Sequence, residues 1–262
     1  MDKPLSGPLS GALHGRVALV TGAGSGMGRT HCEVMAERGA HVIVQELIPE
    51  RAESVAAAIR ASGGSAEAMP GDSSEVARMK ALIAEAEQRL GHIDILVNNA
   101  GISGLQAPFE QVDEAAFDRM LTVHLKSAFF CSQAVVPGMK ARRYGRIVNM
   151  SSMFAMKGSP DAPHYTVAKG GMLGLTKALA RELAAWNITV NAIAPGLVKS
   201  EMTMKSIKDE RIFDERAQFV PMKRLATPRD VSLTVAFLAS DDAALVTGQT
   251  ISPSGGDVIP GV

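Results

Sequence analysis

Tyr165 and Lys169, in the second half of the chain, have the types and spacing of a proton-transfer site. They stand four residues apart in the segment YTVAK, so a helix there would place both side chains on one face. An ammonium group beside a phenol lowers the phenol pKa from its usual value of about 10 towards the working pH. Such a phenol can give a proton to an alcohol or carbonyl oxygen, or take one from it.

Two serine residues stand ahead of this pair. Ser151 and Ser152 follow the apolar segment RIVNM, and Tyr165 comes 13 residues after Ser152. A serine hydroxyl beside the reacting oxygen would hydrogen-bond that oxygen and stabilise the charge that develops on it. Other interpretations stay open, because many helices contain a Tyr–Lys pair. The serines would then be a polar strand end, and Tyr165 a core residue with a satisfied hydroxyl.

A glycine-rich turn near the amino terminus has the chemistry of a phosphate site. Residues 21–28 read TGAGSGMG and join a short apolar segment to a helical pattern. Backbone without Cβ atoms lets a pyrophosphate approach closely, and the first turn of a helix offers free N–H groups. A flexible turn is the alternative, but the position between strand and helix favours a dinucleotide site.

Glu46 follows Gly28 by 18 residues and closes the next predicted strand. A carboxylate there accepts hydrogen bonds from the ribose hydroxyls of NAD and repels the 2′-phosphate of NADP. The sequence therefore favours NAD as the cofactor. Glu46 could instead be a solvated loop carboxylate, and Arg51, five residues further on, keeps NADP open.

Short apolar segments alternate with helical patterns along the chain, which predicts a parallel sheet covered by helices on both faces. We expect one doubly wound, three-layer Rossmann domain from residue 15 to 262, after a loose leader at 1–14 and with a substrate lid at 197–221. The predicted strands are residues 17–21, 41–45, 66–69, 93–97, 146–150, 188–192 and 249–251. The predicted helices are residues 26–38, 49–61, 74–90, 113–139, 163–185 and 228–239, and residues 200–220 are irregular to helical.

The composition narrows the classes of partner. Lys and Arg total 27, as do Asp and Glu, and this balance argues against a nucleic-acid binder. No apolar run approaches the roughly 20 residues that span a membrane. The two cysteines, Cys32 and Cys131, have no metal-ligand spacing, so we expect buried free thiols and no metal site. Few cysteines and no export signal favour the cytoplasm.

These motifs together resemble the short-chain dehydrogenase/reductase family, from about residue 13 to about residue 256. The glycine spacing of Gly22, Gly26 and Gly28 is typical of that family, and so is the interval between Ser152 and Tyr165. The resemblance implies an oxidoreductase that exchanges a hydride between NAD(H) and a secondary alcohol or ketone. It assigns catalysis to Ser152, Tyr165 and Lys169, and we expect Ser151 to shape the turn.

The resemblance also implies a set of coenzyme contacts. The segment NNAG after the fourth predicted strand would support the cofactor site, and Asp94 would support the adenine-side loop. Asp72 would lie near the adenine, with an ordinary helix cap as the alternative. Besides the three glycines, Glu46, Tyr165 and Lys169, the implied cofactor-binding residues are Ser25, Met27, Leu47, Asp72, Ser73, Asn99, Ala100, Gly101, Pro195, Gly196, Val198 and Ser200.

One position departs from the family pattern. In the segment VHLKSAF, His124 stands where the family usually has an asparagine that anchors a water between the lysine and solvent. Imidazole both donates and accepts hydrogen bonds, so a proton relay through His124 is one hypothesis. The alternative is a packed helix residue with no part in proton transfer.

The substrate is less well defined. Predicted wall residues are Ser103, Leu105, Met153, Phe154, His164 and residues 197–221. Methionines near these positions are typical of a hydrophobic or variable substrate, or fill gaps in the core. An NADPH-dependent 3-oxoacyl reductase and a non-catalytic NAD-binding scaffold are the alternative functions. Helices that are apolar nearly all round favour an oligomer, and the resemblance implies a homotetramer; burial in a large core is the competing explanation.

Overall fold

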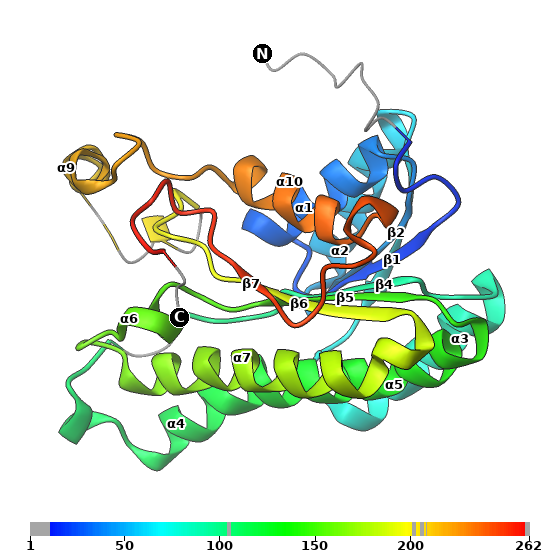
Figure 1. Cartoon of the computed structure of the whole chain (residues 1–262), viewed down its shortest axis with the longest axis horizontal. Coiled ribbons are helices and arrows are strands. Elements are labelled where there is room, and N and C mark those ends of the chain that lie inside the picture. Colours follow the sequence, from blue (N-terminus) through cyan, green and yellow to red (C-terminus); the bar gives the residue numbers. More distant parts are fainter. Residues whose placement is uncertain (1–10, 104–105, 201–202, 205–206, 208, 260–262) are drawn as a thin grey trace.

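The chain folds into a parallel sheet between two layers of helices (Figure 1). The computed structural model describes residues 11–103, 106–200, 203–204, 207 and 209–259. These residues form seven parallel strands in the order β3-β2-β1-β4-β5-β6-β7, which confirms the predicted fold class. The strands are β1 (Val17–Val20), β2 (His41–Glu46), β3 (Ser65–Pro70), β4 (Ile95–Asn98), β5 (Gly145–Met150), β6 (Ile188–Ile193) and β7 (Thr250–Ile251).

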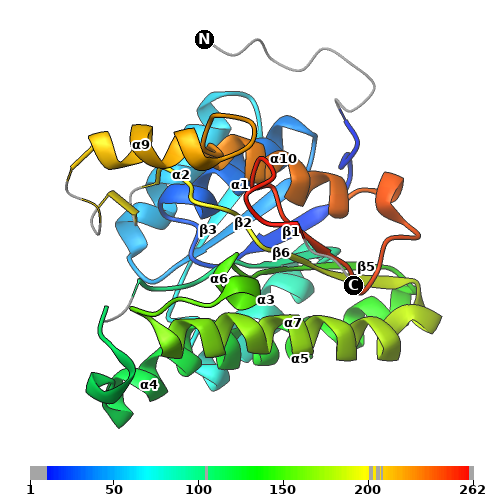
Figure 2. The same cartoon turned by 60° about the vertical axis from the view of Figure 1, so that its left-hand side comes forward.

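Helices cover both faces of the sheet, and the two layers are seen edge-on in Figures 1 and 2. One layer consists of α1 (Gly26–Glu37), α2 (Pro49–Ala61) and α10 (Pro228–Leu238). The other consists of α3 (Val76–Leu90), α4 (Glu114–Leu121), α5 (Ser127–Arg142) and α7 (Pro163–Leu183). The short α6 (Phe154–Lys157) and α9 (Arg211–Phe219) lie at one end of the molecule, on the left of Figure 1.

The core is divided by the sheet into two apolar clusters. Successive side chains of a strand point to opposite faces, so in β1 Ala18 and Val20 belong to one cluster and Val17 and Leu19 to the other. All four side chains are buried. Because both faces of the sheet are covered, the strands read as continuous apolar runs, and this pattern made them recognisable in the sequence.

The helix predicted over residues 113–139 is not continuous. It consists of α4, a π-helical turn at Thr122–Lys126 and α5, which continues to Arg142 with Pro137 inside it. A π turn adds one residue per hydrogen-bonded ring and hardly changes the apolar pattern of the sequence. The π turn therefore has no clear signal in the sequence. The short helix α6 was also not predicted, because four residues are too few to show a helical repeat of apolar side chains.

The boundary of the folded unit lies before residue 15. Residues 1–10 of the predicted leader lie outside the described residues. Leu13, however, is fully buried, and its N–H donates to the Arg38 carbonyl oxygen at 3.0 Å. Cys32 and Cys131 are buried free thiols, as predicted. In the described part of the chain, no helix is long and apolar enough to cross a membrane.

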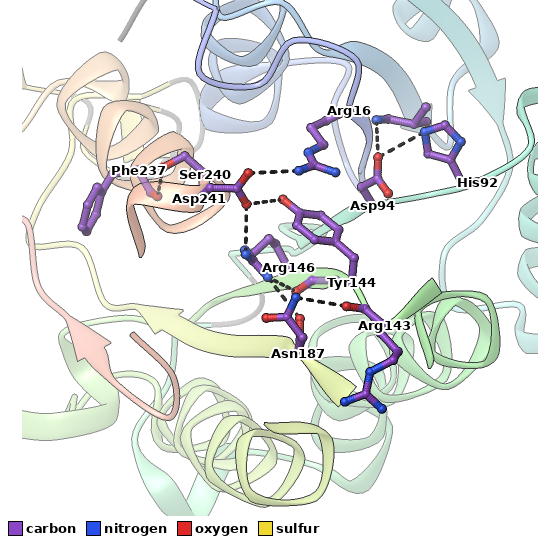
Figure 3. Close-up of polar contacts among 12 residues, drawn as sticks. Arg16, His92, Asp94, Arg143, Tyr144, Arg146, Asn187, Phe237, Ser240 and Asp241 are labelled. Atoms are coloured by element: carbon purple, nitrogen blue, oxygen red, sulfur yellow. Dashed lines mark hydrogen bonds and ion pairs between the residues drawn. The ribbon is translucent and has the colours of Figure 1, made fainter. Parts of the chain in front are cut away.

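Asp94 lies at the amino edge of the sheet, directly before β4. Its carboxylate accepts a hydrogen bond from the Val17 N–H at 3.2 Å and lies 3.2 Å from His92 Nε2 (Figure 3). The predicted support of an adenine-side loop is therefore wrong, because a loop after a strand lies at the opposite, carboxyl edge. The strand predicted over residues 93–97 included Asp94, whereas the observed strand β4 begins at Ile95.

A second polar group at the amino edge joins β1, β5 and the residues after α10 (Figure 3). The Asp241 carboxylate accepts hydrogen bonds from Arg16 at 3.0 Å, Tyr144 at 2.9 Å and Arg146 at 3.0 Å. The two guanidinium carbons lie 3.8 and 4.3 Å from the centre of the Tyr144 ring. Arg146 is buried, so Asp241 is the partner that balances its charge.

We expect Asp241→Asn to lower the free energy of unfolding by about 1 kcal/mol, since the carboxylate is 61% exposed and water screens exposed ion pairs. Desolvation raises the pKa of Asp241, but the hydrogen bonds from Tyr144 and Arg16 lower it more and hold it below its usual value. Because this pKa is lower in the folded protein than its unfolded value of about 3.9, the ionised carboxylate stabilises the folded protein above that pH. The stabilisation is lost as the pH falls through the folded-state pKa.

Urea unfolding of both proteins at pH 7 and at pH 3.5 measures this difference. The neighbouring Asp242→Asn is the matched control and should change stability by less than about 0.5 kcal/mol. An equal loss in the two variants, or a loss that stays constant with pH, would contradict the role assigned to Asp241.

Candidate active site

A pocket of about 470 Å³ lies at the carboxyl edge of the sheet. It is lined by residues at the carboxyl ends of β2 and β5 and by residues that follow β1 to β6, together with residues of α1, α4, the π turn and α7. Parallel sheets bind ligands at this edge. The predicted site residues on its wall are Gly22, Ser25, Gly26, Met27, Gly28, Glu46, Leu47, Asp72, Ser73, Asn99, Ala100, Gly101, His124, Tyr165, Lys169 and Ser200.

The glycine turn packs directly against the segment after β4. A Cβ atom on Gly28 would overlap the Gly22 carbonyl oxygen and lie 2.6 Å from Asn99 Nδ2. A Cβ atom on Gly22 would lie 2.8 Å from the Ala100 Cα, and Gly22 also has a positive φ of 61°. These two glycines are therefore required by the close approach of two backbone segments. The turn is open at Gly26, the first residue of α1, where nothing lies within 4 Å of an added Cβ atom.

Hydrogen bonds of Thr21 and Asn99 stabilise the contact between the glycine turn and the segment after β4. The Thr21 hydroxyl accepts hydrogen bonds from the N–H groups of Asn99 and Ala100, each at 3.0 Å. The Asn99 side-chain amide donates to the carbonyl oxygens of Thr21 at 2.9 Å and Gly22 at 3.1 Å. Sequence reasoning missed Thr21, although a polar residue at the end of an apolar strand was a signal.

Gln45 is a second residue that the sequence analysis did not select. It is buried in β2, accepts from the Gly22 N–H at 3.4 Å and donates to the Gly71 carbonyl oxygen at 2.6 Å. It thus connects the glycine turn to the loop after β3. An amide inside the apolar strand HVIVQE was the available signal.

The two predicted adenine-side carboxylates lie on the pocket wall. The Glu46 oxygens accept hydrogen bonds from the N–H groups of Gly24 at 3.0 Å and Ile48 at 3.2 Å. Asp72 accepts from the Ser74 N–H at 2.8 Å and the Ser74 hydroxyl at 2.7 Å. Asp72 therefore shapes its own turn, while Glu46 lies directly beside the glycine turn.

Lys169 is largely buried and lines the pocket. Its ammonium group donates to the Met150 carbonyl oxygen at 2.6 Å, and its own carbonyl oxygen accepts from the Ser151 hydroxyl at 2.8 Å. Ser151 thus joins β5 to α7, as its predicted role in shaping the turn required. Burial lowers the pKa of Lys169 to about 7, so this side chain changes charge near neutral pH.

Tyr165 and Ser152 are brought together above Lys169. Burial raises the pKa of the Tyr165 phenol, and a hydrogen bond with Ser152 opposes that rise. The expected lowering of this pKa by Lys169 is wrong, because burial raises it and Lys169 is not among the groups that lower it. The Lys169 Nζ lies 5.7 Å from the centre of the Tyr165 ring and is itself desolvated, so it does not offset the burial of the phenol.

His124 lies in the π turn, and its ring is held between two neighbours. Nε2 accepts from the Ile102 N–H at 3.1 Å and also lies 2.9 Å from the Ile102 carbonyl oxygen. The ring meets the Tyr165 ring edge to face, with centres 5.4 Å apart. A Cβ atom on Gly101 would come within 2.9 Å of Nδ1, so glycine at that position makes room for the imidazole.

The His124 imidazole is neutral at physiological pH. Burial and the nearby Lys169 hold its pKa well below the usual 6.5. Among the described residues, Nδ1 has no hydrogen-bond partner. The imidazole packs against Tyr165, and any proton relay through His124 would have to use the neutral ring.

Four predicted site residues lie outside the pocket lining. Ser152 is buried, and its hydroxyl accepts from the Phe154 N–H at 3.2 Å. The Pro195 carbonyl oxygen accepts a hydrogen bond from the Met153 N–H at 3.0 Å. A Cβ atom on Gly196 would lie 3.0 Å from Ser254 Cβ. Val198 forms a parallel bridge with Ala226. These contacts place the segment after β6 next to the segment after β5.

The predicted substrate wall is only partly observed. Ser103 lines the pocket, and Leu105 lies outside the described residues. Met153 and His164 are buried and, like Phe154, are not part of the pocket lining. Several lining residues were not selected from the sequence because only the fold brings their segments to this edge: Gln45, Arg51, Gly71, Ser74, Ile102, Arg119, Val123, Met150 and Ser151.

The chain is similar to known proteins along most of its length. A sequence model described as "Enoyl-(Acyl carrier protein) reductase" matches residues 22–257. The 3-oxoacyl-[acyl-carrier-protein] reductase FabG of Staphylococcus epidermidis is 40% identical over 240 residues, 91% of this chain and 97% of that protein. Two solved structures are also similar. One is 7α-hydroxysteroid dehydrogenase with NADH and 7-oxo glycochenodeoxycholic acid, at 34% identity, TM-score 0.90, and 97% and 98% coverage of the two chains. The other is levodione reductase, at 33% identity, TM-score 0.89, and 93% and 98% coverage.

These matches and the arrangement of the pocket agree on the class of protein. The chain belongs to the short-chain dehydrogenase/reductase family. It is accordingly an oxidoreductase that acts on a CH–OH group or on the corresponding ketone, and its family binds a nicotinamide coenzyme.

Proposed function

We propose that the protein transfers a hydride between NAD(H) and a secondary alcohol or ketone. The observation that carries the proposal is that a single pocket is lined both by Tyr165 and Lys169 and by Glu46 with the glycine turn. The glycine turn is open at Gly26, where nothing lies within 4 Å of an added Cβ atom, so a pyrophosphate would fit there at the start of α1. Asn99, Ala100 and Gly101, together with Pro195, Gly196, Val198 and Ser200, complete the proposed coenzyme site.

The chain's own residues handle the substrate oxygen and its proton. The nicotinamide, when bound, accepts or supplies the hydride. Ser152 donates a hydrogen bond to the substrate oxygen, and Tyr165 takes the proton from the alcohol or returns it to the ketone. Lys169 lies beside Tyr165 and titrates near neutral pH, so its ammonium form would stabilise the phenolate that remains when Tyr165 gives up its proton. The predicted lid at residues 197–221 stays part of the proposal, and its residues 201–202, 205–206 and 208 lie outside the described residues.

A coenzyme-reduction assay tests the proposal. NAD⁺ and NADP⁺ would each be offered with a panel of steroid, sugar, cyclic-diol and hydroxy-acid substrates, and absorbance at the reduced nicotinamide band would be followed. Turnover of at least one alcohol with NAD⁺ as the better coenzyme supports the proposal. Nucleotide binding without turnover across the panel would favour the non-catalytic scaffold.

Reduction of a 3-oxoacyl thioester is the second candidate function. It is favoured by the name of the Staphylococcus epidermidis relative, which is 40% identical. Glu46 argues against NADPH, because its carboxylate lies beside the glycine turn and would repel a 2′-phosphate bound nearby. Oxidation of NADH and of NADPH in the presence of a 3-oxoacyl thioester separates this function from that of an NAD-dependent alcohol dehydrogenase.

We expect His124→Ala to slow turnover by roughly 10- to 100-fold and to change its pH profile, because an oriented proton path and the packing against Tyr165 are both lost. His124→Asn should recover part of the rate, since an amide can bond to both groups of Ile102. The measurement is kcat between pH 5.5 and 9.5. A slower His124→Ala enzyme with an unchanged profile would contradict a relay and leave only the orienting role.

We also propose a homotetramer in the cytoplasm. Apolar side chains are exposed on the helices of one layer: Phe117 on α4, Phe129 on α5 and Val167 on α7 are 36%, 45% and 52% exposed. A second copy that covered them would gain hydrophobic stabilisation. The two free thiols suit a reducing compartment. Sedimentation velocity at several protein concentrations measures the assembly state.

A further inference from the structure

Helix α9, on the left of Figure 1, borders a second cavity of about 450 Å³. The cavity is lined by residues of α9, by Lys199 and by residues 223–227. None of the described residues that line it belongs to the lining of the catalytic pocket. Its volume is within the range of small-molecule sites, roughly 300–1,000 Å³, so it is a separate candidate site.

One part of this lining is apolar. Phe213 and Ala217 stand four residues apart on α9, which places both side chains on one face of the helix. Phe213 is only 3% exposed. Leu225 and Ala226 also line the cavity and are half-buried. A ligand with an apolar chain would therefore find apolar surface to cover.

Another part of the lining is cationic. Lys199, Lys223 and Arg224 are exposed at the cavity, together with one carboxylate, that of Asp214. The Lys199 Nζ lies 5.6 Å from the centre of the Phe213 ring. Positive charge and apolar surface are thus next to each other, an arrangement that suits a ligand with an anionic head and an apolar chain.

Lys223 is the cation of this group that a new anion can reach most easily. The other two cations form ion pairs with carboxylates outside the lining, at 3.3 and 2.8 Å. Within the described part of the chain, no carboxylate, Asp214 included, forms an ion pair with Lys223. Its ammonium group donates one hydrogen bond, to the Gln218 carbonyl oxygen at 2.8 Å. Since an ammonium group has three donors, N–H groups remain for a ligand.

The backbone of Lys223 is strained. Its φ of 55° lies in the left-handed region, which is costly for residues other than glycine. Its N–H donates to the Val220 carbonyl oxygen at 2.8 Å and closes the turn after α9. Strained residues of this kind occur most often at ligand sites and active sites. A lysine at this position therefore supports a role for its charge.

We propose that the cavity binds a small amphipathic carboxylate, with its apolar chain against Phe213 and Ala217 and its carboxylate at Lys223. A carboxylate forms charge-assisted hydrogen bonds with an ammonium group. Binding of this kind goes beyond the proposed hydride transfer, because it involves neither the coenzyme nor Tyr165. Since α9 belongs to the predicted lid at 197–221, a ligand between α9 and residues 223–227 would restrain that helix.

Calorimetric titration of the full chain with sodium octanoate at low salt measures this binding. Acetate, which has the charge without the chain, and 1-octanol, which has the chain without the charge, are titrated in parallel. We expect octanoate to bind at least about 10-fold more tightly than either, because only octanoate uses both parts of the lining. Its affinity should fall as ionic strength rises, since salt screens exposed charges.

Lys223→Gln should raise the Kd for octanoate by about 10-fold, the worth of one charge-assisted hydrogen bond. Lys177→Gln is the matched control, because it removes the same charge from α7, outside the lining of both cavities. It should leave the Kd unchanged. Thermal unfolding of the two variants verifies that both are folded.

Hydrogen exchange read by mass spectrometry locates the ligand without any substitution. Octanoate should slow the exchange of amides in residues 211–219 and 223–227, which border the cavity. It should leave unchanged the amides of residues 99–103 and 123–124, which line the catalytic pocket.

The outcomes are distinct. Preference for octanoate, weakened by Lys223→Gln and accompanied by slower exchange in α9, supports the site. Slower exchange confined to the catalytic-pocket segments overturns it, because octanoate would then bind there. Equal affinity of the wild type and Lys223→Gln, or octanoate binding no tighter than acetate, overturns it as well. Failure to bind NAD⁺ would contradict only the proposed function, because these titrations contain no coenzyme.

Discussion

Tyr165→Phe should lower kcat by about 10²- to 10⁴-fold, the usual contribution of a positioned acid–base group, while NAD⁺ binds with nearly unchanged affinity. The substitution removes only the phenol oxygen, and the ring that meets His124 edge to face is retained. Steady-state kinetics with the best alcohol from the substrate panel, together with calorimetry of NAD⁺ binding, measure the two effects separately.

Tyr144→Phe is the matched control, since the chain contains two tyrosines. Tyr144 lies at the amino edge of the sheet and hydrogen-bonds Asp241 (Figure 3), far along the strands from the pocket. It should retain full turnover and lose only a little stability. If Tyr165→Phe kept more than about one tenth of the wild-type rate, the assignment of proton transfer to Tyr165 would be wrong, given the range that such groups contribute.

The pH dependence of the wild type follows from the same residue. Because burial raises the pKa of Tyr165, the free protein holds this phenol protonated at neutral pH. Alcohol oxidation needs the phenolate, so its rate should increase as the pH rises above neutral. Tyr165→Phe should lose this increase.

Gly28→Ala should abolish measurable binding of NAD⁺ and lower the free energy of unfolding by about 1–3 kcal/mol, the cost of overpacking a closely packed contact. The added Cβ atom would overlap the Gly22 carbonyl oxygen and lie 2.6 Å from Asn99 Nδ2. Both neighbours are held by hydrogen bonds to Thr21 and Gln45, so the added methyl group would distort the glycine turn that is proposed to bind the pyrophosphate. Calorimetry and thermal unfolding report the two losses.

Gly174→Ala is the control for the second prediction. Gly174 lies within α7, and nothing lies within 4 Å of a Cβ atom added there. Alanine in a helix should stabilise the protein by up to about 1 kcal/mol and leave the NAD⁺ affinity unchanged. Binding of NAD⁺ by Gly28→Ala with wild-type affinity would show that the pyrophosphate lies elsewhere.

The sequence by itself determined the fold class and the main elements of the site. Strands buried on both faces are continuous apolar runs, and helices repeat their apolar residues with a different period, so both are local patterns. The glycine turn and the Tyr165–Lys169 pair are also local, because a few consecutive residues define them. Glu46 was found in the same way, from a fixed distance along one βαβ unit.

The tertiary structure alone decided how these groups act on one another. The direction of the Tyr165 pKa depends on burial and on where Lys169 lies, and no spacing along the chain contains that information. The place of His124 depends on a π turn and on the missing side chain of Gly101. Thr21, Gln45 and Arg51 join the site because strands and helices from separate parts of the chain meet at one edge. Contacts of this kind are set by packing in three dimensions, whereas a sequence pattern records only neighbours along the chain.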